Sequence, residues 1–386
     1  MADRILILGV SARAAAASAR RAGLEPFCID LFADRDTHLL ADCLRCPPEE
    51  YPRGLFRLAK QAPPMPWMYT GGLENYPELI DALAKERTLF GNESRQIRSV
   101  RDPYRLFAIL TAHDIRTPFV SPAGPPAPFS GPWLIKRYRG SGGKGIAHYD
   151  YDPGSPRSGY IQQYIPGGSM SAVFAAKPWR VSPLATTRQL IGESWLHAGK
   201  FQYCGNIGPC SVEPDITERV RSIGQTVTQY GPKFGLYGVD YIENDSEPWV
   251  IEVNPRYPAS VEVIEYACRA SLLKWHVDFT AVSGNGSKQD WAEPSPLVRH
   301  SVVGKAIYYA PHRLTVPASG PWDESLRHVL DVWRRPDFAD IPHPGDVIEA
   351  GQPVLTILAE AATEEACLTR LKSRAAELNQ LLIRCR

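Results

Sequence analysis

The stretch 238–256, which reads GVDYIENDSEPWVIEVNPR, contains two carboxylates and an amide at a spacing that suits a metal site. The pattern predicts two strands joined by a polar turn, and alternation along the strands directs Asp240 and Glu252 to the same face. Asn254 lies on that face as well. Their oxygens are hard ligands of the kind that Mg²⁺ binds, and Arg256 adds a donor for phosphate or carboxylate oxygens. The alternative is a surface hairpin with solvated acids.

A glycine-rich stretch, 133–150, reads WLIKRYRGSGGKGIAHYD and follows a predicted strand that carries Lys136. Glycine amides between two strands can close over phosphates, with the Lys136 ammonium beneath them on the α- and β-phosphates. The pattern is not a Walker A loop, which needs GxxxxGK[ST] leading into a helix. A flexible hairpin is the alternative. The phosphate-binding candidates in this loop are Gly142, Gly143, Lys144 and Gly145.

A third stretch, 160–168 (YIQQYIPGG), predicts a strand that ends in a hinge and a Pro-Gly turn. The backbone of Gln163, Tyr164 and Ile165 could bind adenine beside the glycine loop. Taken without its neighbours, this stretch would be a plain connecting strand.

The N-terminus predicts the start of a parallel sheet, because RILILG, an alanine-rich helix and FCID form a strand-helix-strand unit. The turn GVSAR lies where open α/β sheets bind ligands, although it is not GxGxxG. Residues 170–195 predict antiparallel strands. Candidate substrate contacts at these positions and after the hairpin are Ser11, Arg13, Gln189 and Tyr257.

The remaining patterns predict a glycine-interrupted loop at 201–209, helices at about 216–234 and 260–267, and short strands after residue 297. The PGDVIEAGQPV hairpin has no lysine at its tip, so it is not a biotinyl or lipoyl carrier. A final helix is expected at about 363–384. We expect an N-terminal α/β domain at 1–95, a central module at 96–290 with lobes at about 130–168 and 169–290, and a C-terminal β-rich domain with its helix at 291–386.

The composition excludes several classes of partner. Basic and acidic residues number 43 and 42, so no net charge favours nucleic acid or a membrane surface. No apolar run approaches the roughly 20 residues of a membrane helix, and we expect a cytoplasmic protein. Eight scattered cysteines indicate reduced thiols. The Cys43-x-x-Cys46 pair has no partner motif that would complete a zinc site.

The chain resembles the ATP-grasp superfamily of carboxylate–amine ligases. The resemblance rests on four features in this order: the strand-helix-strand start, the lysine with its glycine loop, the hinge strand, and the sequence Asp…Glu-x-Asn-Pro-Arg. The resemblance covers roughly residues 1–290. It implies an α/β fold with a Rossmann-like N-terminal domain, a two-lobed α+β module and a small C-terminal domain. It also implies that ATP and Mg²⁺ are the cofactors, with Mn²⁺ as the alternative ion. Asp240, Glu252 and Asn254 would be metal ligands, and Lys136 and Arg256 catalytic cations.

The chain departs from the family pattern in two places. Many members have Asp-Lys where this chain has Asp102-Pro103, so Arg101 or Arg105 would replace a second phosphate lysine. Many members also have an acidic residue after the hinge for the ribose hydroxyls, and residues 160–176 contain none. The resemblance therefore assigns the adenine hinge to Gln163, Tyr164 and Ile165 but assigns no residue to the ribose hydroxyls.

Within the superfamily, the chain resembles the branch near the pyrrolysine-pathway ligase and tyramine–glutamate ligase. Three stretches carry this resemblance: SARAAA, NPRYPASVE and the tail HPGDVIEAGQPVLTILA. That resemblance implies a ligase, often a homodimer, that joins a small-molecule carboxylate and an amine through an acylphosphate. An amino acid such as glutamate would be a substrate, in cofactor biosynthesis linked to methanofuran and tetrahydromethanopterin. The alternatives are a bicarbonate-activating carboxylase similar to biotin carboxylase or a purine-pathway enzyme, and a non-catalytic nucleotide sensor.

Overall fold

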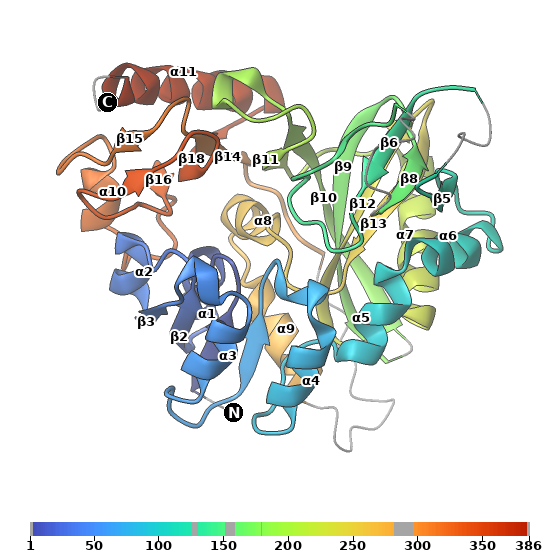
Figure 1. Cartoon of the computed structure of the whole chain (residues 1–386), viewed down its shortest axis with the longest axis horizontal. Helices are drawn as coiled ribbons and strands as arrows, with labels where there is room; N and C mark the ends of the chain where they lie inside the picture. Colours follow the sequence, from blue (N-terminus) through green and yellow to red (C-terminus); the bar gives the residue numbers. More distant parts are fainter. Residues whose placement is uncertain (1–2, 125–129, 151–158, 179, 282–295, 384–386) are drawn as a thin grey trace.

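The protein is described by a computed structural model over residues 3–124, 130–150, 159–178, 180–281 and 296–383 of the 386-residue chain. These residues form four β-sheets, one of them parallel, with helices packed against them (Figure 1). The mixed α/β class predicted from the sequence is confirmed.

The N-terminal sheet is parallel and has the strand order β3-β2-β1-β4. Its first strand is buried on both faces, as is usual in a parallel sheet. Ile5 and Ile7 pack with the alanines of α1, whereas Leu6 and Leu8 pack in the cluster that contains Leu55 of α3. The elements of this part are β1 (Arg4–Leu8), α1 (Arg13–Arg21), β2 (Glu25–Asp30), α2 (Arg35–Leu40), β3 (Asp42–Arg45), a 3₁₀ turn (Pro48–Glu50), α3 (Arg53–Ala59) and β4 (Trp67–Tyr69).

A group of short helices connects this sheet to the rest of the chain. α5 was not expected from the sequence, because SRQIRSVR is mostly polar and buries only Ile97 and Val100 among its apolar side chains. Asp102 then begins α6 as its N-cap, and its carboxylate accepts from the amides of Tyr104 and Arg105. The bounds are a 3₁₀ turn (Leu73–Asn75), α4 (Pro77–Ala84), α5 (Ser94–Arg101) and α6 (Pro103–Thr111).

A small antiparallel sheet with the order β5-β8-β6-β7 follows. It holds the hinge strand and the strand of Lys136, while the strand expected after the glycine loop is only two residues long. Part of the expected linker at 121–132 lies outside the described residues. The bounds are β5 (Val120–Pro122), β6 (Trp133–Lys136), β7 (Ala147–His148) and β8 (Tyr160–Gln163).

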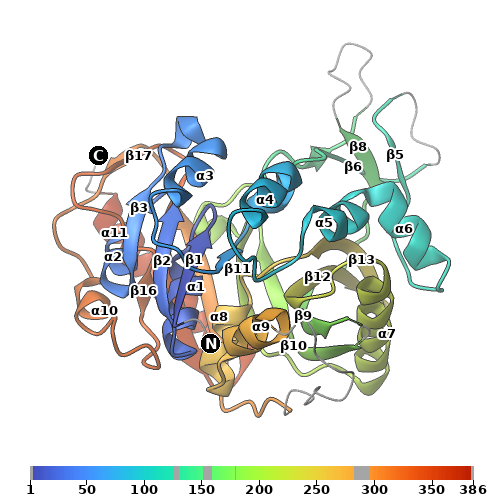
Figure 2. The ribbon, with the colours of Figure 1, turned by 90° about the horizontal axis from the view of Figure 1, so that it is seen from below.

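An eight-stranded sheet with the order β13-β12-β9-β10-β11-β14-β18-β16 forms the largest layer. α7 packs against the β9, β10 and β13 part of this sheet, and α8 and α9 lie between it and the N-terminal sheet (Figure 2). The bounds are β9 (Gly168–Lys177), β10 (Arg180–Ile191), a 3₁₀ turn (Ser194–Leu196), β11 (Tyr203–Gly208), α7 (Pro214–Tyr230), β12 (Gly235–Asn244), β13 (Glu247–Asn254), α8 (Val261–Cys268) and α9 (Leu272–Ala281).

The expectation of a loop at 201–209 is wrong, because this segment contains strand β11. Gly205 has a φ of 142°, and a Cβ atom there would lie 2.0 Å from the carbonyl oxygen of Lys305 in β14. The glycine therefore permits close strand pairing, whereas the sequence suggested a break.

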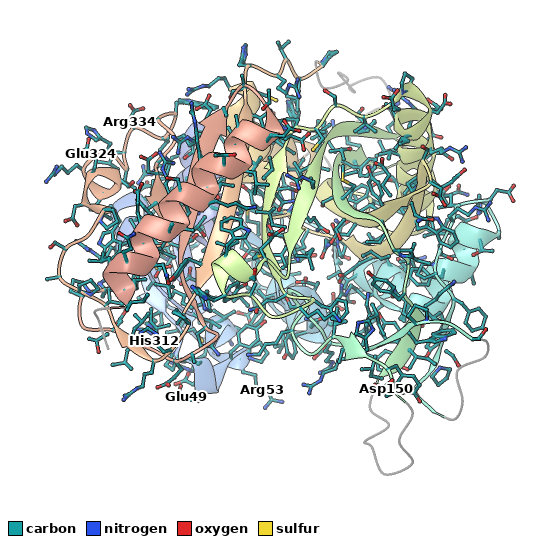
Figure 3. The ribbon with its side chains drawn as sticks, turned by 90° about the horizontal axis from the view of Figure 1, so that it is seen from above. Glu49, Arg53, Asp150, His312, Glu324 and Arg334 are labelled. Carbon is teal, nitrogen blue, oxygen red and sulfur yellow. The ribbon has the colours of Figure 1, made fainter. Side chains whose placement is uncertain are left out.

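The C-terminal strands β14 and β18 continue the same sheet, and β16 ends it. α11 crosses these strands from above, burying Cys367 and Leu371 (Figure 3). The domain boundary expected near residue 290 lies outside the described residues. No helix in the described part of the chain is both long and apolar enough to cross a membrane. The bounds are β14 (Val302–Tyr309), β15 (Leu314–Thr315), α10 (Asp323–Arg327), β16 (Phe338–Ala339), β17 (Val347–Ile348), β18 (Pro353–Ala361) and α11 (Glu364–Leu382).

Candidate active site

The antiparallel pair β12–β13 brings the three predicted metal ligands together. Asp240 lies opposite Glu252, and Gly238 lies opposite Asn254. The Ser171 hydroxyl donates to Oδ1 of Asp240 at 2.7 Å, and Nδ2 of Asn254 donates to Oδ2 of Asp240 at 2.9 Å. The three side chains therefore share one face of the hairpin, and that face lines a cleft.

The cleft has a volume of about 930 Å³ and lies between the N-terminal sheet, the small sheet, the large sheet and the C-terminal strands. Its lining includes all the predicted site residues except two in the glycine loop. Lys144 instead lines a smaller adjoining cavity of about 70 Å³ together with Lys136, Arg101 and Glu252. Gly145 follows it with a φ of 84°. The cleft and the adjoining cavity are thus lined by predicted site residues that range from Ser11 to Tyr257 in the sequence.

Opposite charges lie together in this region, where Lys136 is buried and Asp240 and Glu252 are half-buried. Burial and the neighbouring Glu252 carboxylate raise the pKa of Asp240 to about 6. Burial lowers the pKa of Lys136 at the end of β6, although Glu252 and Asp240 favour its charged form. Two acids compete for limited positive charge here, so an added cation would be stabilised.

Arg101, the last residue of α5, forms an ion pair with Glu252. Its NH2 group also donates to Oδ1 of Asn75 at 2.9 Å and to the carbonyl oxygen of Gly140 at 3.2 Å. Arg101 therefore connects the metal-ligand hairpin with the glycine loop. Arg105, the other candidate for a second phosphate-binding cation, is exposed on α6.

Arg256 is held between the hairpin and the N-terminal part of the chain. Its NH2 group donates to Oδ1 of Asn254 at 3.0 Å, and its Nε donates to Oε1 of Glu74 at 3.0 Å. Burial opposes ionisation of Glu74, but the guanidinium groups of Arg256 and Arg101 hold its pKa below the ordinary value. Glu74 and Asn75 were not predicted from the sequence, although the glycines after β4 mark a ligand-binding edge of the parallel sheet.

The glycine loop approaches the segment between β10 and β11. Gly142 and Gly143 have φ values of 59° and 73°, and the carbonyl oxygen of Gly142 accepts from the amide of Tyr203 at 3.0 Å. A Cβ atom on Gly143 would lie 1.9 Å from the carbonyl oxygen of Phe201. Glycine is therefore required for this approach, both by its φ and by its neighbour.

Two of the three hinge amides are already used within the protein. The amide of Gln163 donates to Phe119 O at 2.9 Å, and the amide of Tyr164 donates to Pro132 O at 3.0 Å. Both residues and Ile165 line the cleft. Any backbone donation to a nucleobase would therefore come from Ile165, while the carbonyl groups of the hinge remain suitable acceptors.

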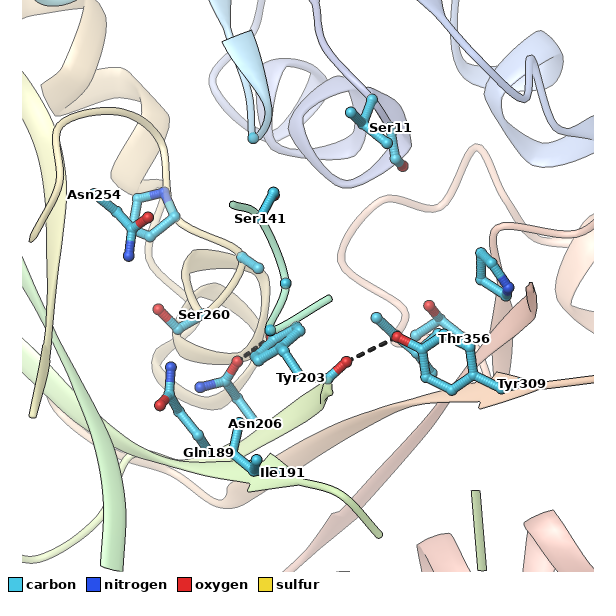
Figure 4. A pocket seen from close by; sticks show the side chains of 18 of the residues that line it. Ser11, Ser141, Gln189, Ile191, Tyr203, Asn206, Asn254, Ser260, Tyr309 and Thr356 are labelled. Atoms are coloured by element: carbon cyan, nitrogen blue, oxygen red, sulfur yellow. Dashed lines mark hydrogen bonds between the residues drawn. The ribbon is translucent and has the colours of Figure 1, made fainter. Parts of the chain in front are cut away.

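The four predicted substrate contacts also line the cleft, and Gln189 lies beside the hairpin, where its side chain forms a hydrogen bond with Asp240. Arg13 is only 2% exposed and is engaged by carboxylates, forming an ion pair with Glu262 and another with Asp340 at 3.0 Å. Its guanidinium thereby joins α1 to α8 and to the loop before β17. Tyr257 is buried, whereas Ser11 is exposed and lies across the cleft from Gln189 (Figure 4).

Four polar residues of β11 and β14 also line the cleft, and the sequence analysis did not predict them. Tyr203 donates from its hydroxyl to Asn206, and the Tyr309 hydroxyl donates to the carbonyl oxygen of Tyr203 at 2.8 Å (Figure 4). Lys305 lies opposite Asn206 in the strand register and donates to Glu262 at 3.3 Å. Because 201–209 was expected to be a loop, no alternating pattern pointed to Tyr203 and Asn206. Lys305 and Tyr309 lie in a segment where strands were expected, but the sequence did not show that this segment pairs with β11.

Comparison with known proteins gives a consistent result. Residues 100–260 match the family model of an ATP-grasp domain. An uncharacterised protein of Methanocaldococcus jannaschii is 25% identical over 199 residues, which cover 52% of this chain and 42% of that relative. The chain therefore matches less than half the length of its curated relative.

Solved structures resemble the chain over almost its whole length. An L-amino acid ligase from Bacillus licheniformis has a TM-score of 0.69 at 15% identity, covering 98% of both chains. The biotin carboxylase domain of Hydrogenobacter thermophilus 2-oxoglutarate carboxylase, solved with MgADP and bicarbonate, has a TM-score of 0.70 at 14% identity, covering 97% and 89%. An N5-carboxyaminoimidazole ribonucleotide synthetase from Thermotoga maritima has a TM-score of 0.67 at 13% identity, and the match covers 98% of both chains. Identities this low show a shared fold, and within that fold residues 100–260 match the model of an ATP-grasp domain.

Proposed function

We propose that the protein is an ATP-dependent ligase that activates a carboxylate and transfers its acyl group to an amine. The observation that supports this most directly is the gathering, around one cleft of about 930 Å³, of the hinge, the glycine loop, Lys136 and the acidic hairpin. The cleft is large enough for a nucleotide and a second small molecule. A non-catalytic nucleotide sensor is disfavoured, because it would not need two adjacent carboxylates beside a phosphate-binding lysine.

The hairpin fits Mg²⁺ by the chemistry of its donors. Asp240 and Glu252 present two carboxylates, and the raised pKa of Asp240 reflects burial and negative charge that a cation would offset. The Asn254 oxygen accepts from Arg256 in this structure, so the side-chain amide would have to turn over to place that oxygen beside the carboxylates. Among the described residues no group of three or more His, Cys, Asp or Glu side chains is arranged to hold a metal, and the third protein ligand that we propose is the amide oxygen of Asn254. A bound Mg²⁺, or Mn²⁺ as the alternative, would neutralise phosphate charge during transfer.

The protein's own groups would position the reactants and neutralise charge. The substrate carboxylate attacks the γ-phosphorus of ATP, the bond to the β-phosphate oxygen breaks, and ADP leaves. Lys136 would bind the α- and β-phosphates, and Arg101 would take the place of the missing second lysine because it is buried beside Lys136 and Glu252. Arg256 would hold the acyl phosphate or substrate carboxylate.

The second half of the reaction needs a dry site. A neutral amine attacks the acyl carbon, an amide bond forms, and phosphate leaves with the mixed-anhydride oxygen. The glycine loop would cover the acylphosphate and exclude water that would otherwise hydrolyse it. Its close approach to Phe201 and Tyr203 indicates where it would close.

The substrates we propose are an amino acid such as glutamate and a small-molecule amine, in cofactor biosynthesis linked to methanofuran and tetrahydromethanopterin. The pathway rests on sequence resemblance alone. We also propose a cytoplasmic homodimer, which light scattering coupled to gel filtration would test.

An ADP-release screen tests the function. Purified protein with ATP and Mg²⁺ is paired with amino acids, amines and the cofactor precursors, and each product is identified by mass spectrometry. We expect ADP and phosphate to form only when both a carboxylate and an amine are present. ADP release that needs bicarbonate and no amine would favour the carboxylase alternative, and tight ATP binding without turnover would favour the sensor.

A further inference from the structure

Asp34, in the loop between β2 and α2, has a buried carboxylate without a partner. It is the N-cap residue of α2, yet its side chain accepts no capping hydrogen bond from the helix. The residue is 6% exposed and lines the cleft. In the part of the chain that the structure describes, no hydrogen bond or ion pair engages this carboxylate. An aspartate that does not cap its helix, is almost wholly buried and opens only into the cleft needs another explanation.

The surroundings of Asp34 are acidic. Burial raises its pKa well above the ordinary value, and the nearby carboxylates of Asp36, Asp340 and Asp30 raise it further. Arg13 opposes this effect, but its guanidinium already contacts Asp36, Asp340 and Glu262. Asp34 thus lies near three other carboxylates, and a cationic ligand would be stabilised beside it.

The other acids of this group already have protein partners. Asp30 accepts from the amides of Ala12 and Ala33 at 2.7 Å each. Asp36 accepts from the amides of Asp340 and Ile341 at 2.8 and 3.0 Å. Asp34 alone among these acids faces the cleft with its hydrogen-bonding capacity unused, as judged over the described residues. A single carboxylate without a protein partner suits the ammonium group of an organic cation, which needs one charged acceptor and no set of several ligands.

We propose that Asp34 binds the α-ammonium group of an amino acid whose carboxylate is the one activated, an inference that rests on the proposed ligase function. Arg256 lines the same cleft from the hairpin side. A zwitterionic amino acid thus finds an anionic and a cationic partner in one cavity. The bound ammonium keeps its proton and serves recognition. The nucleophile is a different, neutral amine, so this assignment excludes bicarbonate as the activated acid.

Binding without ATP tests the inference separately from catalysis. The twenty common amino acids are ranked by the thermal stabilisation they give the full chain, and the best is compared by calorimetry with the carboxylic acid of the same skeleton that has no α-amino group. We expect the amino acid to bind at least about tenfold more tightly, and Asp34→Asn to abolish that difference. Equal binding of the two compounds, no stabilisation by any amino acid, or unchanged affinity in Asp34→Asn would overturn the proposal.

Matched variants separate recognition from folding. Glu349→Gln, another acid of the cleft lining that is exposed and paired with Arg313 at 3.0 Å, should leave amino-acid affinity unchanged. Asp34→Asn should raise the melting temperature because it removes charge repulsion, whereas Asp36→Asn should lower it because two amides lose a charged acceptor. A lower melting temperature for Asp34→Asn would contradict an unpartnered carboxylate.

Failure of the inference and failure of the proposed function give different results. Glu252→Ala should retain amino-acid binding while losing ADP release. If the wild type prefers amino acids through Asp34 but never releases ADP, the binding site stands and the ligase proposal fails. If ADP release requires an acid without an α-amino group, the ligase proposal stands and the role of Asp34 fails.

Discussion

Arg101 and Glu252 form an ion pair that joins the end of α5 to the strand carrying the proposed metal ligands. The same guanidinium donates to the glycine-loop carbonyl of Gly140 at 3.2 Å. Glu252 is thus bound to a side-chain cation at the position where a metal cation is proposed. Arg101 is the group best placed to exchange that carboxylate for a phosphate when ATP binds.

The first prediction concerns Arg101→Ala. The variant should bind ATP at least about tenfold more weakly, because a buried guanidinium that would contact phosphate is lost. Calorimetry with ATP and Mg²⁺ measures the change, and Arg101→Lys should recover part of the affinity. Arg105→Ala removes an exposed arginine four residues away and should have no effect. If Arg105→Ala weakens ATP binding and Arg101→Ala does not, the second phosphate cation is Arg105.

Glu252→Ala should lower Mg²⁺-dependent ADP formation by about 100-fold or more, since the hairpin keeps only one carboxylate ligand. Circular dichroism should show an intact fold. Glu247→Ala provides a control on the same strand, where Glu247 forms an exposed pair with Arg219. Near-normal turnover of Glu252→Ala would remove this residue from the metal site.

Lys136→Met should weaken ATP binding about tenfold while keeping the volume of the buried side chain. The ammonium group that is lost is the one proposed to lie on the α- and β-phosphates. Lys274→Met removes an exposed lysine paired with Asp278 and serves as the comparison. Unchanged nucleotide affinity of Lys136→Met in calorimetry would refute the role.

His276 predicts a pH dependence of stability. Burial lowers its pKa from 6.5 to about 4, and the neutral ring accepts from the amide of Leu236 at 2.8 Å. Between these pH values the unfolded chain binds the proton and the folded chain does not. Stability from this group is therefore full above pH 6.5 and is lost as pH falls to about 4, by up to about 3 kcal/mol.

The comparison with His276→Gln isolates this effect, because the acidic groups of the protein are common to both chains. Urea unfolding at several pH values should show the wild type losing stability faster than the variant between pH 6.5 and 4. Parallel curves for the two proteins would mean that the ring is protonated in the folded state.

Local patterns were sufficient to predict the parts of the site that lie on regular strands. Alternation identified Asp240, Glu252 and Asn254, and the apolar runs identified the N-terminal sheet. The contacts of Arg101 with Glu252 and of Arg13 with Asp340 join segments 151 and 327 residues apart, and no local pattern reports such pairs. Asp34 was missed for the same reason, since its burial depends on the C-terminal loop.

Strand β11 illustrates a different limit. Its glycine reads locally as a break, but Gly205 allows β11 to pair closely with β14, whose Ala306 lies opposite it. In an isolated segment a glycine favours a break in the strand, whereas beside a partner strand it permits close backbone pairing. Only the folded structure shows which of the two applies. The polar wall formed by Tyr203, Asn206 and Lys305 was therefore not predictable from spacing alone.

The continuity of the large sheet also determines how the protein can be divided. β14 lies inside the sheet, between β11 and β18, so a chain truncated before it would turn β11 into an exposed edge. Unpaired edges of this kind recruit other strands, and such a fragment should aggregate instead of folding as a minimal nucleotide-binding unit. We therefore expect the last ninety residues to be required for the folding of strands β9–β13, and both parts should be expressed together in functional studies.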